Sequence, residues 1–206
     1  MEDWIQLFDG TQLFFMEGPQ KIADTVTAEQ IAHGLSFLCR YAGQCDAFYS
    51  VAEHSALMAH YVYERLIKND HLGLLGTDEC RRAALGALFH DATEAFLPDI
   101  PRPLKVHLPD YYDMEARLME GIALKFDLSD LLQVQGEPGH RKVVLHRVIS
   151  ECDNRILVDE KAAIMTRGAH HVWASDCLEP LGVNIRCLSP ADAKTFFLQT
   201  YELLTD

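Results

Sequence analysis

Apolar side chains recur at helical spacing along most of this chain. Ile31, Leu35 and Leu38 repeat three or four residues apart, and Thr27-Ala-Glu-Gln30 before them has the form of a capping box. We therefore predict a helix over 28–39. A second box, Ser50-Val-Ala-Glu53, precedes another apolar stripe and predicts a helix that runs to about residue 68.

The same spacing predicts further helices at 77–88, 110–126, 129–134, 142–165 and 190–204. Thr77 or Asp78 is expected to cap the first of them, and Ser189-Pro190 has the form of an N-cap followed by proline at the first helical position. Three prolines at 98, 101 and 103 exclude regular helix, so the segment up to residue 109 is predicted to be an ordered loop.

Strand signals are confined to two places. Apolar runs at 4–8 and 12–16 flank Asp9-Gly10-Thr11, which is typical of a β-hairpin, and 183–188 is compatible with a strand beside it. The predicted fold class is mostly α, a helical bundle with a small N-terminal β-hairpin. We expect a single domain over 1–206, made of a hairpin (1–20), a helical core (22–165) and a C-terminal strand and helix (166–206).

Composition narrows the classes of function. The chain has 206 residues with 49% apolar content, enough for a sizeable core, and its net charge of −13 argues against binding to a nucleic-acid polymer. No apolar run reaches the length of a membrane helix, and the N-terminus lacks the layout of a signal peptide. The cytoplasm is the expected location, no membrane partner is expected, and a homodimer stays open.

Three potential ligands lie on the apolar sides of predicted helices. His54 shares its stripe with Val51 and Leu57, His90 follows a run of small apolar residues, and Asp153 lies between Ile149 and Ile156. A buried carboxylate needs a cation, hydrogen-bond donors or a metal. Each residue could be satisfied separately, but a metal explains all of them, with Asp91 as a fourth ligand at a helix end.

Two imidazoles and two carboxylates suit one divalent transition metal ion, Mn²⁺, Fe²⁺, Co²⁺, Ni²⁺ or Zn²⁺. Such an ion would make phosphoester hydrolysis feasible near neutral pH. Glu94 follows His90 by about one turn and Asp99 is held among prolines, so both are candidates for acid-base catalysis. Taken singly, Glu94 is better explained as a solvated helix-end carboxylate and Asp99 as a turn residue before the proline-rich loop.

These motifs together resemble the HD-domain metal-dependent phosphohydrolases. The ordered set is Glu53-His54-Ser55, His90-Asp91-Ala-Thr-Glu94, Asp99-Ile-Pro-Arg-Pro-Leu-Lys105 and a late Asp153. Cys39-Arg40-Tyr41-Ala42-Gly43-Gln44 and the residues up to His54 are similar, more narrowly, to small bacterial and prophage HD hydrolases akin to the 5′-deoxynucleotidases. The resemblance covers about residues 22–161.

The resemblance implies a role for each matching residue. His54, His90, Asp91 and Asp153 match the metal ligands, and Glu94 and Asp99 match the carboxylates that handle the water and the leaving group. Arg40 and Lys105 fall where the substrate phosphate is bound, although a cation at a helix end and a solvated loop lysine are the plain alternatives. Tyr41 stands in place of a family tryptophan, and Ile149-Ser150-Glu151-Cys152 replaces an acidic stretch. Base and sugar preference therefore stay open.

The resemblance favours hydrolysis of (deoxy)nucleoside 5′-monophosphates, a small-molecule substrate. A (deoxy)nucleoside triphosphate triphosphohydrolase is the alternative within the enzymes, and a non-catalytic HD module that binds metal or nucleotide is the alternative of another class. Elsewhere, His170-His171 beside Trp173 could form a second metal or stacking site, but adjacent histidines in a loop are more typical of a surface.

Overall fold

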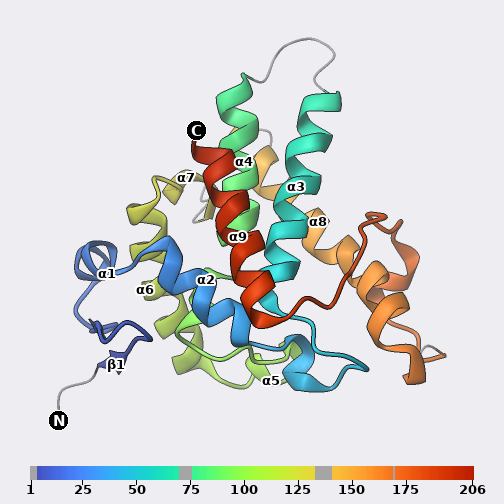
Figure 1. The fold of residues 1–206 in the computed structure, drawn as a ribbon, viewed down its shortest axis with the longest axis horizontal. Coiled ribbons are helices and arrows are strands. Elements are labelled where there is room, and N and C mark those ends of the chain that lie inside the picture. The colour runs from blue at the N-terminus through green and yellow to red at the C-terminus, as the bar shows by residue number, and fades with distance from the viewer. Residues whose placement is uncertain (1–3, 70–75, 133–140, 169) are drawn as a thin grey trace.

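The fold is a bundle of helices with a small hairpin at one end (Figure 1). The computed structural model describes residues 4–69, 76–132, 141–168 and 170–206. The helices of the centre are α3 (Val51–Asn69), α4 (Thr77–Phe89), α8 (Arg141–Ile164) and α9 (Pro190–Thr205). Helix α3 packs against the other three, so it forms the axis of the bundle.

The remaining helices cover this centre. They are α1 (Pro19–Thr25), α2 (Ala28–Phe37), α5 (Arg102–Lys105), α6 (Pro109–Lys125) and α7 (Ser129–Leu132). Helix α2 packs on α9, and α1 packs on α6. The short 3₁₀ turns are η1 (Arg40–Gly43), η2 (Ala92–Ala95), η3 (Thr166–Gly168) and η4 (Ala174–Cys177). The mostly helical fold class is therefore confirmed.

The predicted hairpin is present, as strands β1 (Ile5–Gln6) and β2 (Gln12–Leu13) pair antiparallel. The capping box of α2 is also confirmed, because the Thr27 hydroxyl accepts from the Gln30 amide at 3.2 Å and the Gln30 side chain accepts from the Thr27 amide at 2.9 Å. Ser189 caps α9 as expected. Helix α1, with Pro19 in its first turn, was not predicted.

The N-cap of helix α4 lies one residue before the first of its two predicted caps, Thr77 and Asp78. Gly76 is the N-cap, so Thr77 and Asp78 lie inside the first turn. The Glu79 carboxylate accepts from the Gly76 amide at 3.1 Å and satisfies the helix end instead of a hydroxyl cap. The chain from 133 to 140, which includes the predicted break at 136–139, lies outside the described residues.

The proline-rich segment is more regular than predicted. Residues 92–95 form the turn η2, and Arg102–Lys105 form one helical turn, α5. Pro103 lies within the first turn of α5, where a missing amide hydrogen leaves no intrahelical bond unmade. The prolines therefore restrict the helix in this segment to a single turn, but they do not prevent helix formation.

The predicted strand at 183–188 is wrong, because this stretch pairs with no strand among the described residues. Its backbone instead binds a buried side chain. The carboxylate of Glu53 accepts from the amides of Arg186 and Leu188, both at 2.7 Å. The second capping box is consequently half formed, since the Ser50 hydroxyl accepts from the Glu53 amide but the Glu53 carboxylate is used elsewhere.

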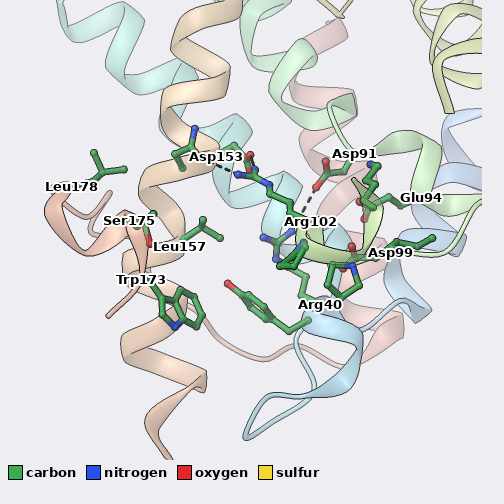
Figure 2. A pocket seen from close by; sticks show the side chains of 17 residues that line it. Arg40, Asp91, Glu94, Asp99, Arg102, Asp153, Leu157, Trp173, Ser175 and Leu178 are labelled. Carbon is green, nitrogen blue, oxygen red and sulfur yellow. Dashed lines mark hydrogen bonds and ion pairs between the residues drawn. The ribbon is translucent and has the colours of Figure 1, made fainter. Parts of the chain in front are cut away.

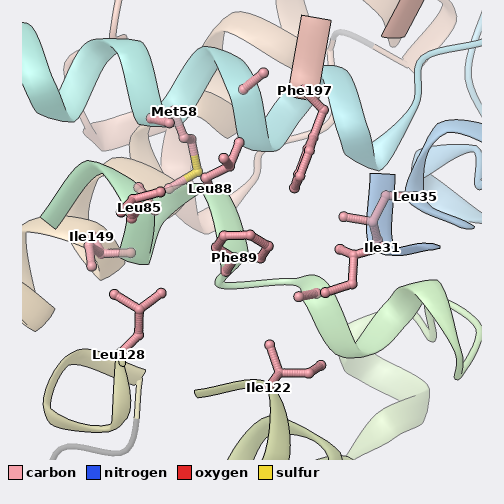
Figure 3. Packing of buried hydrophobic residues seen from close by; sticks show 14 of the residues in the cluster. Ile31, Leu35, Met58, Leu85, Leu88, Phe89, Ile122, Leu128, Ile149 and Phe197 are labelled. Atoms are coloured by element: carbon pink, nitrogen blue, oxygen red, sulfur yellow. The ribbon is translucent and has the colours of Figure 1, made fainter. Parts of the chain in front are cut away.

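The core lies where α3, α4 and α9 meet (Figure 3). Phe89 packs edge-on against Phe197 and face-on against Phe126. Met58, Leu88 and Ile31 are also fully buried, so aliphatic side chains fill the space around these rings. This packing fixes the end of α4, which is followed directly by His90 and Asp91. Within the described part of the chain, the helices are too short or too polar to cross a membrane.

Candidate metal centre

Two histidines from different helices face each other. His54 of α3 is fully buried, and its Nε2 lies 3.4 Å from the Nε2 of His90, which follows α4 directly. The Nδ1 of His90 lies 2.7 Å from the Ala87 carbonyl, and the Nδ1 of His54 lies 2.7 Å from a carboxylate oxygen of Glu160. Both partners are acceptors, so each Nδ1 carries the hydrogen and each Nε2 is left as a ligand.

Two carboxylates complete the cluster. The Oδ2 of Asp91 lies 3.2 Å from the His90 Nε2 and 3.8 Å from the His54 Nε2. The Oδ1 of Asp153, on α8, lies 3.6 and 3.7 Å from the Nε2 atoms of His54 and His90. Ligand atoms of His54, His90 and Asp91 all lie within 4.8 Å of one another. All four residues singled out in the sequence therefore come together.

This donor set fits a divalent cation. Burial alone would lower the pKa of His90, but the Asp91 and Asp153 carboxylates outweigh burial and raise that pKa well above its usual value. The cluster thus favours positive charge at its centre. Two imidazole nitrogens, each directed by a hydrogen bond at its Nδ1, and two carboxylate oxygens are ligands typical of a borderline transition metal.

Glu160 was missed in the sequence, although it holds much of the site together. It is fully buried on α8, two turns after Asp153 and one turn after Ile156. Its carboxylate binds His54, accepts a hydrogen bond from the Arg40 Nη2 at 3.2 Å, and accepts another from the hydroxyl of Tyr41. The stripe that pointed to Asp153 includes Glu160 as well, so the same signal would have found it.

Arg40 is not a solvated cation at a helix end. Helix α2 ends at Phe37, and the Arg40 side chain is nearly buried between Glu160 and Asp91, with its Nη1 3.6 Å from the Asp91 Oδ2. The next residue, Tyr41, has a left-handed backbone with φ 58°. Such a conformation is strained for a residue with a β-carbon. Here it accompanies a tyrosine whose hydroxyl reaches the buried Glu160.

Glu94 and Asp99 lie beside the cluster. The Oε2 of Glu94 is buried and has no hydrogen-bond partner among the described residues. Burial, with Asp91 and Asp99 nearby, raises the pKa of Glu94 to about 9. Burial also raises the pKa of Asp99 against the opposing effect of Arg40. A buried unpartnered oxygen is costly, and it is placed to bind something that enters the site.

These residues line a cavity of about 670 Å³ (Figure 2). Lys105 also lines it and pairs with Glu115 at 2.5 Å, so it is not a solvated loop lysine. Arg102, which the sequence did not single out, crosses from α5 to donate to the Oδ2 of Asp153 at 2.6 Å. Arg102 is exposed and lies in a segment that was predicted to be a loop, so no helical periodicity pointed to it.

His170, His171 and Trp173 lie in the same loop before η4, but their side chains have different surroundings. His170 and His171 are exposed, their rings are tilted against each other with centroids 4.1 Å apart, and neither lines the cavity. Trp173 does line it. The structure therefore groups the tryptophan with the candidate centre and leaves the histidine pair at the surface.

Comparison with known proteins connects this geometry to a family. The family described as "5′-deoxynucleotidase YfbR-like" matches residues 32–159, which include all four residues of the cluster. The uncharacterized protein YfdR of Escherichia coli is 35% identical over 130 residues, which are 63% of this chain and 61% of that protein. The chain thus spans about three fifths of that relative's length.

Two further relatives differ in coverage. The uncharacterized protein RCAP_rcc00048 of Rhodobacter capsulatus is 28% identical over 205 residues, 98% of this chain and 95% of that protein. The 5′-deoxynucleotidase plu3092 of Photorhabdus laumondii is 35% identical over 98 residues, 46% of this chain and 47% of that protein.

Proposed function

The chain belongs to the 5′-deoxynucleotidase YfbR-like family, and from that premise we propose that it hydrolyses the phosphate ester of (deoxy)nucleoside 5′-monophosphates. The family supports a nucleotide phosphohydrolase, and the name of the plu3092 relative supports the monophosphate. One observation carries the proposal. His54, His90, Asp91 and Asp153 converge, and two of them, Asp91 and Asp153, line one cavity together with Glu94, whose Oε2 is buried and unpartnered.

His54, His90, Asp91 and Asp153 hold the metal in this proposal. A divalent ion supplies Lewis acidity when bound, which polarises a phosphoryl oxygen and makes water at the site more acidic. Glu160 and the Ala87 carbonyl keep the Nε2 atoms of His54 and His90 directed at it. The chain's own contribution is therefore a set of ligands oriented before the metal arrives.

Four further residues act on the substrate. Arg40 and Lys105 bind the phosphate, because both cations line the cavity. The Arg40 Nη1 lies 3.6 Å from the Asp91 Oδ2, at the charged end of the cavity. Of Glu94 and Asp99, the ionised carboxylate accepts a proton from the attacking water, and the other, as the protonated carboxylic acid, gives its proton to the 5′-oxygen as the P–O bond breaks. The products are inorganic phosphate and a nucleoside.

The test is a nucleotide panel with metal-loaded protein. Deoxynucleoside monophosphates and the corresponding triphosphates are incubated with Mn²⁺ or Co²⁺, and free phosphate is measured separately from triphosphate. We expect phosphate from the monophosphates. Release of triphosphate would instead establish the triphosphohydrolase alternative, and bound metal and nucleotide with no hydrolysis would establish the non-catalytic module.

Variants assign the roles. Glu94→Gln should keep the metal and lower kcat by about 10²- to 10⁴-fold, as expected for loss of proton transfer. Asp153→Asn should lower metal content as well as activity. Glu151→Gln is the matched control, because Glu151 lies on the same helix but is half exposed and pairs with Arg65 outside the cavity.

A further inference from the structure

The cavity extends well beyond the charged cluster. Asp91, Glu94 and Asp99 lie on one side of it, and Leu157, Trp173 and Leu178 lie on the other (Figure 2). At about 670 Å³ it falls within the range of roughly 300–1,000 Å³ that small-molecule sites occupy. A phosphate at the charged end leaves the apolar end free. Because Arg40 and Lys105 also line the cavity and the proposed metal would add positive charge beside Asp91, the geometry suits a ligand that is anionic at one end and apolar at the other.

Two aromatic rings dominate the apolar end. Trp173 and Tyr41 both line the cavity, and their ring centroids are 5.8 Å apart with an angle of 50° between the planes. A planar group inserted between two parallel rings would need a spacing of about 7 Å, twice the contact distance of carbon atoms. A planar ligand therefore does not fit between the two rings. The rings instead form one wall of the cavity, and the ligand would stack on the face of that wall that is turned to the cavity.

A buried lysine fixes the loop that carries Trp173. Lys161 of α8 is 9% exposed, and its Nζ donates to the His171 carbonyl and to the Asp176 carboxylate, both at 2.6 Å. The same carboxylate accepts from the Trp173 amide at 2.8 Å. These bonds hold the backbone of Trp173, and the Lys161 Nζ also lies 5.4 Å from the centre of the indole ring, so the ring is positioned before a ligand binds.

Tyr41 is fixed independently. Its hydroxyl donates to Glu160, and its backbone is held in the left-handed region at φ 58°. Glu160 also binds His54 and Arg40. One buried carboxylate thus ties the aromatic wall to the phosphate end of the cavity, and the distance between the two ends is set by packed elements.

We propose that Trp173 and Tyr41 form a stacking wall for the nucleobase of the substrate, with Trp173 as the main contact. This inference rests on the proposed nucleotidase function. Trp173 lies outside residues 32–159, so the match to the family does not supply this contact. Stacking on an aromatic face tolerates every base, so the wall should bind purines and pyrimidines alike, and purines more tightly because of their larger area.

Fluorescence tests the wall without relying on catalysis. The sequence contains two tryptophans, so Trp4→Phe leaves Trp173 as the single indole. Titration of this variant with dAMP should quench its fluorescence, and deoxyribose 5-phosphate, which lacks the base, should not. Val172→Ala in the same background is the matched control, since Val172 adjoins Trp173 but is 88% exposed and does not line the cavity.

Kinetics give a second reading. Trp173→Ala should lower the ratio of kcat/KM for dAMP to that for deoxyribose 5-phosphate by about 5- to 150-fold, the range for loss of one stacked base. Trp173→Phe, which keeps a ring, should restore most of the ratio. A loop disturbed by the alanine would slow both substrates equally and leave the ratio unchanged.

The two proposals fail differently. If dAMP does not quench Trp173, or if Trp173→Ala leaves the ratio intact, the stacking wall is wrong while hydrolysis of monophosphates still stands. If the metal-loaded protein hydrolyses no nucleotide, the proposed function is wrong, and the fluorescence titration still decides whether a base binds at Trp173.

Discussion

Among single residues, Glu160 connects the most parts of the site. Burial alone would raise the pKa of Glu160, but Arg40 and His54 outweigh burial and lower it, so the side chain is ionised. One carboxylate oxygen receives the Nδ1 hydrogen of His54, and the other receives hydrogen bonds from Arg40 and Tyr41. The residue thus orients a candidate ligand, a candidate phosphate-binding cation and an aromatic ring without contacting the substrate itself.

Glu160→Gln should weaken metal binding by about 10- to 100-fold, the usual effect of removing the group behind a metal-binding histidine. The amide has similar size but no charge and only one acceptor oxygen, so it cannot serve both His54 and Arg40. Chelator competition with Co²⁺ or Mn²⁺ measures the affinity. Glu151→Gln, an exposed position on the same helix, should leave the affinity unchanged.

A purely structural role for Glu160 would give another result. Thermal unfolding of the variant would shift, while the metal affinity of the folded protein would stay within about twofold of the wild type. That outcome would remove Glu160 from the site as a positioning residue.

The residues of the cluster were predictable because burying charge is costly. Asp153 stood out as a carboxylate on an apolar stripe, and His54 as an imidazole on another. Glu160 has the same pattern and was overlooked. Arg102 has no such pattern, because its contact with Asp153 depends on how α5 packs relative to α8, and a loop sequence does not contain that information.

At the scale of elements, the approach of α2 to η2 positions Glu94. Gly34 in α2 faces Ala95, the last residue of η2. A β-carbon at Gly34 would lie 2.5 Å from the Ala95 carbonyl oxygen and 2.8 Å from its α-carbon. Backbone atoms cannot rotate away, so glycine is required for this close contact.

Gly34→Ala should destabilise the protein by about 1–3 kcal/mol. Alanine in an exposed helix would gain up to about 1 kcal/mol over glycine, but overpacking against backbone outweighs that gain. Because η2 carries Glu94, kcat should fall as well. Chemical denaturation and phosphate release measure the two effects.

Gly76→Ala is the control for this substitution. Its added β-carbon would have its nearest neighbour at 3.9 Å, in the flexible side chain of Glu79. If Gly34→Ala proved as stable as Gly76→Ala, the close packing of α2 on η2 would not be needed to hold the turn.

Elements whose ends are set locally were predicted well. The capping box of α2 and the Ser189 cap of α9 depend on residues within one turn. Residues 183–188 were assigned wrongly because their partner is Glu53, far away in the sequence. An apolar stretch predicts an extended backbone, but it does not say whether a strand or a buried carboxylate will receive its amides.

At the scale of the molecule, the cluster joins parts of the chain that are distant in sequence. His54 comes from α3, His90 and Asp91 from the end of α4, and Asp153 from α8. His54, His90 and Asp153 could be recognised in the sequence as inward-facing and Asp91 as lying at a helix end, but their common meeting point depends on how the three helices pack. A bound ion would consequently act as a cross-link between them.

Metal binding should therefore stabilise the whole fold. At a free metal concentration of 100 times Kd, binding to the native state alone adds about 2.7 kcal/mol. For a chain of 206 residues, each kcal/mol raises Tm by roughly 2–4 °C, so loading should raise Tm by about 5–10 °C and a chelator should reverse the change. Calorimetry with and without EDTA measures this. In Asp153→Asn the rise in Tm on metal loading should be much smaller, because α8 no longer contributes a carboxylate ligand. An equal, full-sized shift in that variant would mean that the stabilising ion binds elsewhere, since the cross-link proposed here requires α8.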